Sequence, residues 1–167
     1  MSVPDLQLYY LMNFLGKNIF VYNEYWEYQR MKSPPSSEYP SSGPSYSLNF
    51  NGTIYVQADG VINKYDKYLN LAKQVSSSGN NRGIYYNAGY QLIYSVITNQ
   101  KVINLYDKDL ILNRNISTNY NPWFITEYNG KMVVTDNDVG KIYFYEGDSV
   151  NRIVVTNCPR SNQLAFI

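Results

Sequence analysis

Short stretches of alternating residues, separated by turn residues, run through most of the chain. In the segment KVINLYD (101–107), side chains at even positions face one side of an extended backbone and those at odd positions face the other. Such segments are five to seven residues long and rich in Ile, Val and Tyr, a composition typical of β-strands. Asn-Gly pairs at 51–52 and 129–130 suit tight hairpin turns, because Asn and Gly tolerate positive φ. The pattern therefore predicts an all-β chain made of hairpins.

The pattern also repeats. VINKYDKYLNL (61–71) and VINLYDKDLIL (102–112) agree at eight of eleven positions, and a third, more divergent copy lies at 129–156. Three tyrosines close the matching segments at intervals of 41 and 39 residues: Tyr65, Tyr106 and Tyr145. An acidic residue follows each of them, where a carboxylate can accept a hydrogen bond from the backbone two residues on. The period is therefore about 40 residues.

Each repeat has room for four short strands. A four-stranded antiparallel unit that recurs every ~40 residues is typical of a β-propeller blade. We predict an all-β partial β-propeller of about three four-stranded antiparallel blades, arranged as an open arc. The predicted blades are 46–75, 83–116 and 123–156, and the opening strand of a fourth is predicted at 162–167. A β-sandwich with fortuitous similarity is the alternative.

Two segments precede this repetitive body, which spans 46–167. Residues 33–47 carry four prolines and many serines, which excludes a helix interior or a central strand and indicates a linker. Residues 1–32 form an N-terminal head, for which we expect a short helix near 5–15 and a strand near 17–22.

Charge and composition exclude several functions. The chain has 14 basic and 13 acidic residues and a net charge of +1, so no nucleic-acid partner is expected. No apolar run is long enough for a membrane span. The absence of His removes the commonest general base and zinc ligand. The single cysteine, Cys158, cannot form an intrachain disulfide, and its partner stays undetermined.

The cellular location stays undetermined from the sequence. The apolar stretch at 6–16 has no basic region before it and no convincing cleavage site after it, so it is a poor signal peptide. An extracellular location stays open. If the protein is secreted, Asn51 and Asn115 are potential N-glycosylation sites, although two such triplets are close to chance in an Asn-rich chain.

The third repeat resembles the NHL repeat, a β-propeller family. Its segment NPWFITEYNGKMVVTDNDVGKIYFYE (121–146) has the Pro, Gly, Asp and acidic residues of that repeat in order, at Pro122, Gly130, Asp136 and Glu146. The second repeat matches it without the Pro, and the Arg usual in the third strand is missing from both. The resemblance covers about 110 residues.

The resemblance implies a noncatalytic binding or interaction scaffold, without a cofactor, whose ligand is a protein or a carbohydrate. One alternative is a metal-dependent hydrolase of the lactonase type, for which the metal candidates are Asp136, Asn137 and Asp138; turn formation explains these residues more simply. A further alternative is a truncated propeller fragment without independent function.

Three residues are candidates for ligand binding. Trp123 and Tyr120 flank Pro122 and offer an aromatic platform, and Arg82 lies where it can line the mouth of a channel. Each has a structural alternative: packing between blades for the aromatic residues and a solvated loop cation for Arg82.

An open arc leaves apolar blade faces bare. The head can cover one face with Leu11, Phe14, Phe20 and Trp26, but not both. We therefore expect self-association, or a partner that supplies further blades; with three blades each, two copies would make six.

Overall fold

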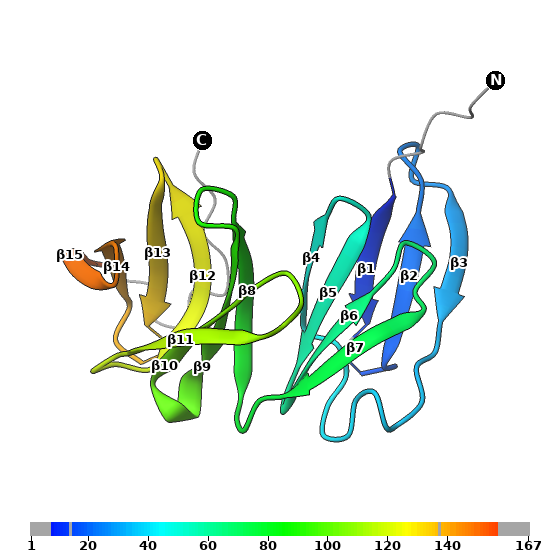
Figure 1. Cartoon of the computed structure of the whole chain (residues 1–167), viewed down its shortest axis with the longest axis horizontal. Coiled ribbons are helices and arrows are strands. Elements are labelled where there is room, and N and C mark those ends of the chain that lie inside the picture. The colour runs from blue at the N-terminus through cyan, green and yellow to red at the C-terminus, as the bar shows by residue number, and fades with distance from the viewer. Residues whose placement is uncertain (1–7, 14, 137, 157–167) are drawn as a thin grey trace.

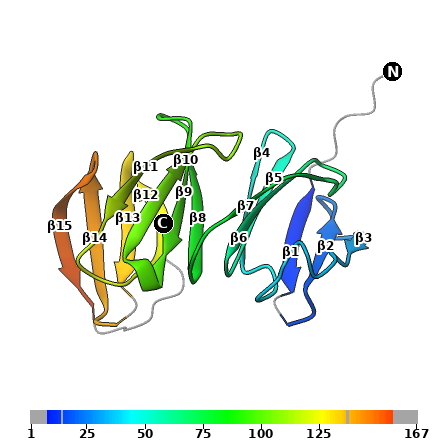
Figure 2. The same cartoon turned by 60° about the horizontal axis from the view of Figure 1, so that its bottom comes forward.

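The computed structural model describes residues 8–13, 15–136 and 138–156. These residues form four antiparallel sheets that follow one another along an arc (Figures 1 and 2). Sheet A contains β1 (Tyr9–Asn13), β2 (Asn18–Tyr22) and β3 (Tyr28–Lys32). Sheet B contains β4 (Tyr46–Phe50), β5 (Thr53–Ala58), β6 (Val61–Tyr65) and β7 (Leu71–Ser76).

The other two sheets form the second half of the arc. Sheet C contains β8 (Asn81–Asn87), β9 (Leu92–Ile97), β10 (Val102–Tyr106) and β11 (Leu112–Ser117), with the short 3-10 helix η1 (Thr98–Gln100) after β9. Sheet D contains β12 (Pro122–Tyr128), β13 (Lys131–Asp136), β14 (Lys141–Glu146) and β15 (Ser149–Val155). The prediction of an all-β partial propeller with an open arc is confirmed.

The structure corrects the prediction for the head. The helix expected near 5–15 is wrong over the described residues, because Tyr9–Asn13 is a strand. The head is a three-stranded sheet, so the arc has four sheets rather than three blades. The strand predicted at 162–167 lies outside the described residues.

Alternation places one face of each sheet against its neighbour. Ile19 and Val21 of β2 are buried against sheet B, in a cluster with Ile54 and Val56 of β5. A second cluster joins sheets B and C, and a third joins sheets C and D. The core is therefore a series of seams between sheets, as expected of blades that each contact only their neighbours.

The Pro- and Ser-rich segment between β3 and β4 is packed against sheets A and B. Tyr39 is fully buried, and its hydroxyl lies 2.9 Å from that of Tyr65. Lys17 of the head donates to the carbonyl oxygen of Tyr39. The segment thus connects the head to the body through buried contacts.

The same turn recurs in sheets A, B and C, after the strand that ends in Tyr. The Oδ1 of Asp66 accepts hydrogen bonds from the backbone of Tyr68 and Asn70, and Asp107 makes the equivalent pair of bonds. In the head, Asn23 accepts from the backbone of Tyr25 and Glu27 in the same way. The sidechain-capped turn predicted at Asp66 and Asp107 is confirmed, and it extends to the head.

This turn joins neighbouring sheets. The carbonyl oxygen of Lys67, in sheet B, accepts from Tyr10 and Arg30 of sheet A. The carbonyl oxygen of Lys108, in sheet C, accepts from Tyr55 of sheet B. The near-identity of the two segments therefore has a physical cause: each copy docks onto the preceding sheet through the same backbone atoms.

Both Asn-Gly pairs form the predicted hairpin turns. Asn51 and Gly52 have φ of 48° and 73°, and Asn129 and Gly130 have φ of 50° and 73°. Positive φ at both central residues gives the twist that suits two-residue hairpins. A Cβ at Gly130 would meet nothing within 4 Å, so only the backbone conformation disfavours a side chain there.

We expect Gly130→Ala to lower the free energy of unfolding by about 1 kcal/mol, because a Cβ penalises left-handed backbone. Gly130→Asn should retain more of the stability, since Asn tolerates this conformation. Urea unfolding followed by circular dichroism measures both. Equal stability of the alanine variant and the parent would contradict the role of the turn.

Candidate functional site

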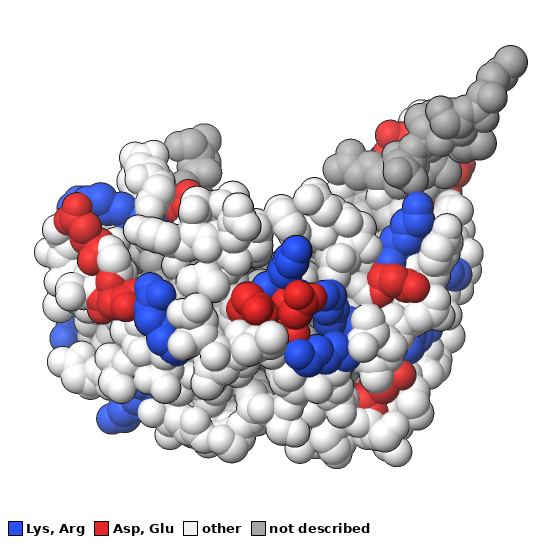
Figure 3. Space-filling view, in the orientation of Figure 1, with Lys and Arg blue, Asp and Glu red and all other residues white. Residues whose placement is uncertain are grey.

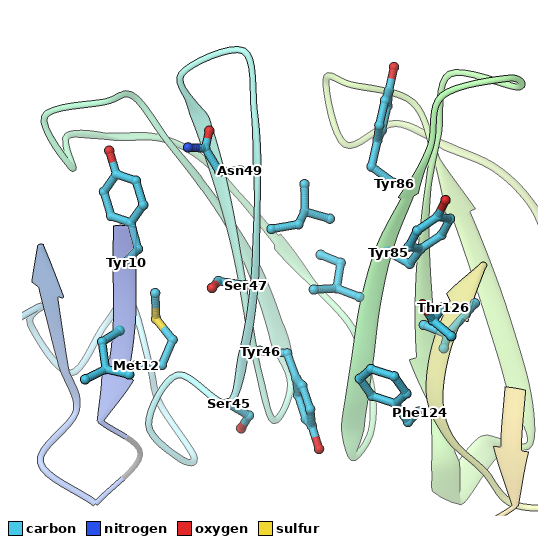
Figure 4. A pocket seen from close by; sticks show the side chains of 14 residues that line it. Tyr10, Met12, Ser45, Tyr46, Ser47, Asn49, Tyr85, Tyr86, Phe124 and Thr126 are labelled. Carbon is cyan, nitrogen blue, oxygen red and sulfur yellow. The ribbon is translucent and has the colours of Figure 1, made fainter. Parts of the chain in front are cut away.

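A groove runs along the inner side of the arc. It is formed by β1 and by the first strands of sheets B, C and D, and has a volume of about 660 Å³ (Figure 4). Aromatic side chains come from all four strands: Tyr10, Tyr46, Tyr85, Tyr86 and Phe124. The rings of Tyr46 and Phe124 lie 6.4 Å apart and bring sheets B and D together across it.

The groove lining is uncharged. Besides the aromatic side chains, it contains apolar and neutral polar residues: Leu11, Met12, Ser45, Ser47, Leu48, Asn49, Ile84, Ile125 and Thr126. No Asp, Glu, Lys or Arg belongs to it among the described residues. Such a surface offers stacking area and hydroxyl or amide hydrogen bonds to a ligand, but no fixed charge.

The tyrosines of the groove stay protonated at neutral pH. Burial raises the pKa of Tyr10 and Tyr46 above the usual value. Burial also raises the pKa of Tyr85, whose hydroxyl donates to Glu127 at 2.5 Å. These hydroxyls therefore act as neutral hydrogen-bonding groups, and a role as general base near pH 7 is disfavoured.

Two of the predicted binding residues lie together near this groove. The guanidinium of Arg82 lies 5.3 Å from the ring centre of Trp123, within the range of a cation–π interaction. Arg82 also forms an ion pair with Asp59 at 3.1 Å. The structure thus gives Arg82 a partner in each neighbouring sheet, which favours bridging of the seams over a solvated loop cation.

Tyr120, the third predicted binding residue, is buried. Its ring stacks on Tyr143 at 3.6 Å, and its hydroxyl lies 2.6 Å from that of Tyr145. These contacts place Tyr120 in the core between sheets C and D, away from Arg82 and Trp123. Packing between blades, the structural alternative, explains its position.

The weak metal candidates lie in the turn between β13 and β14. Asp136 accepts a hydrogen bond from the backbone of Asp138, so its carboxylate caps the turn. Asn121 donates to the carboxylate of Asp138. Asn137 lies outside the described residues. Across the part of the chain that is described, no three His, Cys, Asp or Glu side chains group as a metal site would require.

The two potential glycosylation residues are exposed. Asn51 occupies the hairpin turn between β4 and β5, and Asn115 lies on β11. Cys158 lies outside the described residues. None of the helices in the described ranges has the length and apolar character to cross a bilayer.

Charged side chains form pairs of opposite sign on the face shown in Figure 3, rather than a patch of one sign. Several of these pairs bridge neighbouring sheets. Lys64 of sheet B lies 2.7 Å from Asp109 of sheet C, and Arg114 of sheet C binds Asp148 of sheet D at 2.9 Å.

Sequence reasoning did not predict the groove residues. Tyr46, Tyr85 and Phe124 lie on the first strand of their repeats, the strand that lines the inner side of the arc. Aromatic residues at this position of successive repeats were the signal that could have identified them.

Neither a protein-family model nor a curated protein sequence matches the chain. Solved structures do match it. The Neurospora crassa Pan2 WD40 domain has a TM-score of 0.75 at 8% identity, over 89% of this chain and 46% of that chain. Virginiamycin B lyase from Staphylococcus aureus has a TM-score of 0.70 at 15% identity, over 96% and 55%. Saccharomyces cerevisiae Sqt1 has a TM-score of 0.69 at 10% identity, over 92% and 46%. The chain therefore has a β-propeller fold and spans about half the length of these proteins.

Proposed function

We propose that the protein is a noncatalytic binding module that holds an uncharged ligand, an extended peptide or a carbohydrate, along its inner groove. The observation that carries this proposal is the lining itself, with its aromatic residues and lack of charged groups. Stacking on aromatic rings and neutral hydrogen bonds suit such ligands, whereas hydrolysis requires titratable or metal-bound groups at the reacting atoms.

We also propose that the blades are of the NHL type. Pro122 begins β12, Gly130 lies in the following hairpin turn, and Asp136 and Glu146 end β13 and β14. These positions support the order of Pro, Gly, Asp and acidic residue on which the resemblance rests.

Phe124→Ala tests the groove. We expect a neutral oligosaccharide array or a displayed peptide library to yield a ligand whose affinity falls at least tenfold in this variant, because the ring contributes much of the stacking area. Tyr90→Ala is the matched control, since Tyr90 is exposed in the turn between β8 and β9. Equal loss of affinity in both variants would contradict the assignment of the groove.

A calcium titration tests the noncatalytic character. We expect no micromolar binding in calorimetry, because the described carboxylates of Asp136 and Asp138 cap a turn. Micromolar binding that Asp136→Ala abolishes, together with lactone hydrolysis, would favour the hydrolase instead.

The partner prediction also stays a proposal. Four sheets in an open arc require either further blades or a covering surface, from a second copy of the chain or from another protein.

A further inference from the structure

Sheet A lacks the innermost strand of a blade. Tyr10 of β1 donates to the carbonyl oxygen of Lys67 in sheet B, as Tyr55 of β5 donates to Lys108 in sheet C. Because β5 is the second strand of sheet B, β1 is the second strand of its own blade. Tyr22 follows Tyr10 by twelve residues, the interval that separates Tyr94 from Tyr106. The three strands of sheet A therefore correspond to strands two to four.

The free edge of β1 borders the groove. Among the described strands, β1 pairs with β2 alone. The edge that β4 occupies in sheet B is thus open in sheet A, and Tyr10, Leu11 and Met12 of β1 line the groove at this place (Figure 4). An open edge presents unpaired backbone groups on which an added strand can form hydrogen bonds.

The outer face of sheet A is built like the covered faces of sheets B and C. Leu69 and Leu110 have positive φ in their turns and are 3% and 2% exposed, because the preceding sheet covers them. Trp26 has the same place in the turn of sheet A, with φ of 60°, and is 67% exposed. It stacks on Tyr9, beside a cross-strand row of Leu11, Phe20 and Met31. This face has the features of a seam without its preceding sheet.

The far end of the arc has the complementary feature. A basic residue two positions into the regular pairing of each fourth strand reaches the turn of the next sheet: Arg30 binds Lys67 O, Lys73 binds Asp109 O and Arg114 binds Asp148. Arg152 of β15 is the next member of this series, at the open end of sheet D. The turn of sheet A carries Glu24 and Glu27, whose charges are opposite to that of Arg152.

We propose that two copies of the chain close head to tail into a ring of eight blades, in which the C-terminal segment 160–167 of each copy forms the missing innermost strand of sheet A in the other. Sheet D of one copy covers Trp26 of its partner, and the same contact recurs at the opposite side, as two-fold symmetry requires. The expected total of six blades is thereby corrected to eight. The solved propellers support a second copy as the occupant, because this chain spans 46–58% of their length.

The spacing of the repeats gives the register of the added strand. Tyr85 and Thr126, which pair with the second strands of their sheets, lie nine residues after the ends of β7 and β11. Nine residues after the end of β15 is Leu164, which is therefore expected opposite Tyr10. Antiparallel pairing then places Gln163 opposite Leu11. Residues 1–7 are the competing occupant, but they contain Pro4 and no Gly or Asn for a tight turn into β1.

Disulfide trapping between two different chains tests the proposal. In a Cys158→Ser background, one chain carries Leu11→Cys and the other Gln163→Cys. Mild oxidation of the mixture should yield a cross-linked heterodimer in most of the protein, whereas either chain alone stays uncross-linked. Leu11→Cys mixed with Tyr90→Cys is the control and should not cross-link. A double variant that forms its disulfide within one chain, or a mixture that does not cross-link, would overturn the proposal.

Trp26→Asp tests the face independently of the strand. It should weaken dimerisation at least tenfold in sedimentation velocity, because a charge would be buried at the centre of the seam. Tyr90→Asp, at an exposed aromatic residue elsewhere, should leave dimerisation unchanged. Undiminished dimerisation of the Trp26 variant would contradict the seam. Both experiments measure assembly and not ligand binding, so their failure is distinguishable from failure of the groove assignment.

Discussion

Replacing Leu110 with alanine is expected to lower the free energy of unfolding by about 3 kcal/mol, within the range for buried leucines. Leu110 is 2% exposed and packs in the seam between sheets B and C, with Tyr55 and Ile62. Both leucine and alanine have a Cβ, so the positive φ of this residue disfavours them similarly and the change isolates packing. Urea unfolding at fixed protein concentration measures the effect.

Leu112→Ala is the matched control, because Leu112 is exposed on the neighbouring strand β11. It should change stability by less than about 0.5 kcal/mol. A Leu110 variant as stable as this control would show that the repeated turn does not hold the sheets together.

Stability is expected to fall by several kcal/mol between pH 10 and pH 12. Burial raises the pKa of Tyr39 and of Tyr55 to about 12, and it also raises the pKa of Tyr65. In the unfolded chain these phenols release their protons near pH 10, while the folded protein keeps them. Because the unfolded state then binds fewer protons, stability is complete below pH 10 and is lost as pH rises through the folded pKa. A shift of two units at Tyr39 alone corresponds to about 2.7 kcal/mol.

Absorbance at 295 nm and circular dichroism, recorded together along an alkaline titration, measure this effect. A fraction of the 19 tyrosines should ionise only as the fold is lost. Tyr39→Phe should reduce the pH dependence, since it removes one of the buried phenols. Ionisation of every tyrosine near pH 10 with an unchanged fold would contradict the packing around Tyr39 and Tyr65.

The repeats could be predicted from the sequence because each copy must meet the same physical demand. The turn after Tyr65 and Tyr106 needs a carboxylate to cap its backbone and a leucine to fill the seam, so the residues recur at fixed spacing. The hairpin turns could be predicted for a related reason, since Asn-Gly is favoured where two successive residues have positive φ.

The sheet in the head was missed although the same signals were present. Ile19 and Tyr22 match Ile103 and Tyr106, and Asn23 takes the place of Asp107. An amide oxygen caps this turn as well as a carboxylate does, and Trp26 replaces the leucine. A search for an acidic residue and a leucine could not find it, but the interval of twelve residues between Tyr10 and Tyr22 could have.

The groove was missed because its residues are brought together only by the arrangement of the sheets. Tyr10, Tyr46, Tyr85 and Phe124 are separated by about 40 residues along the chain and share no local motif. Tyr120 shows the converse. Its place beside Trp123 in the sequence indicated a shared platform, but the chain turns at Pro122 and directs Tyr120 into the seam between sheets C and D.

Native mass spectrometry of the purified chain is the most direct test of the central claim, that this chain is half of a propeller and is completed by a second copy. The account predicts a single assembly with twice the chain mass of 19.4 kDa at micromolar concentration. A monomer of 19.4 kDa at tens of micromolar, with cooperative unfolding, would contradict it.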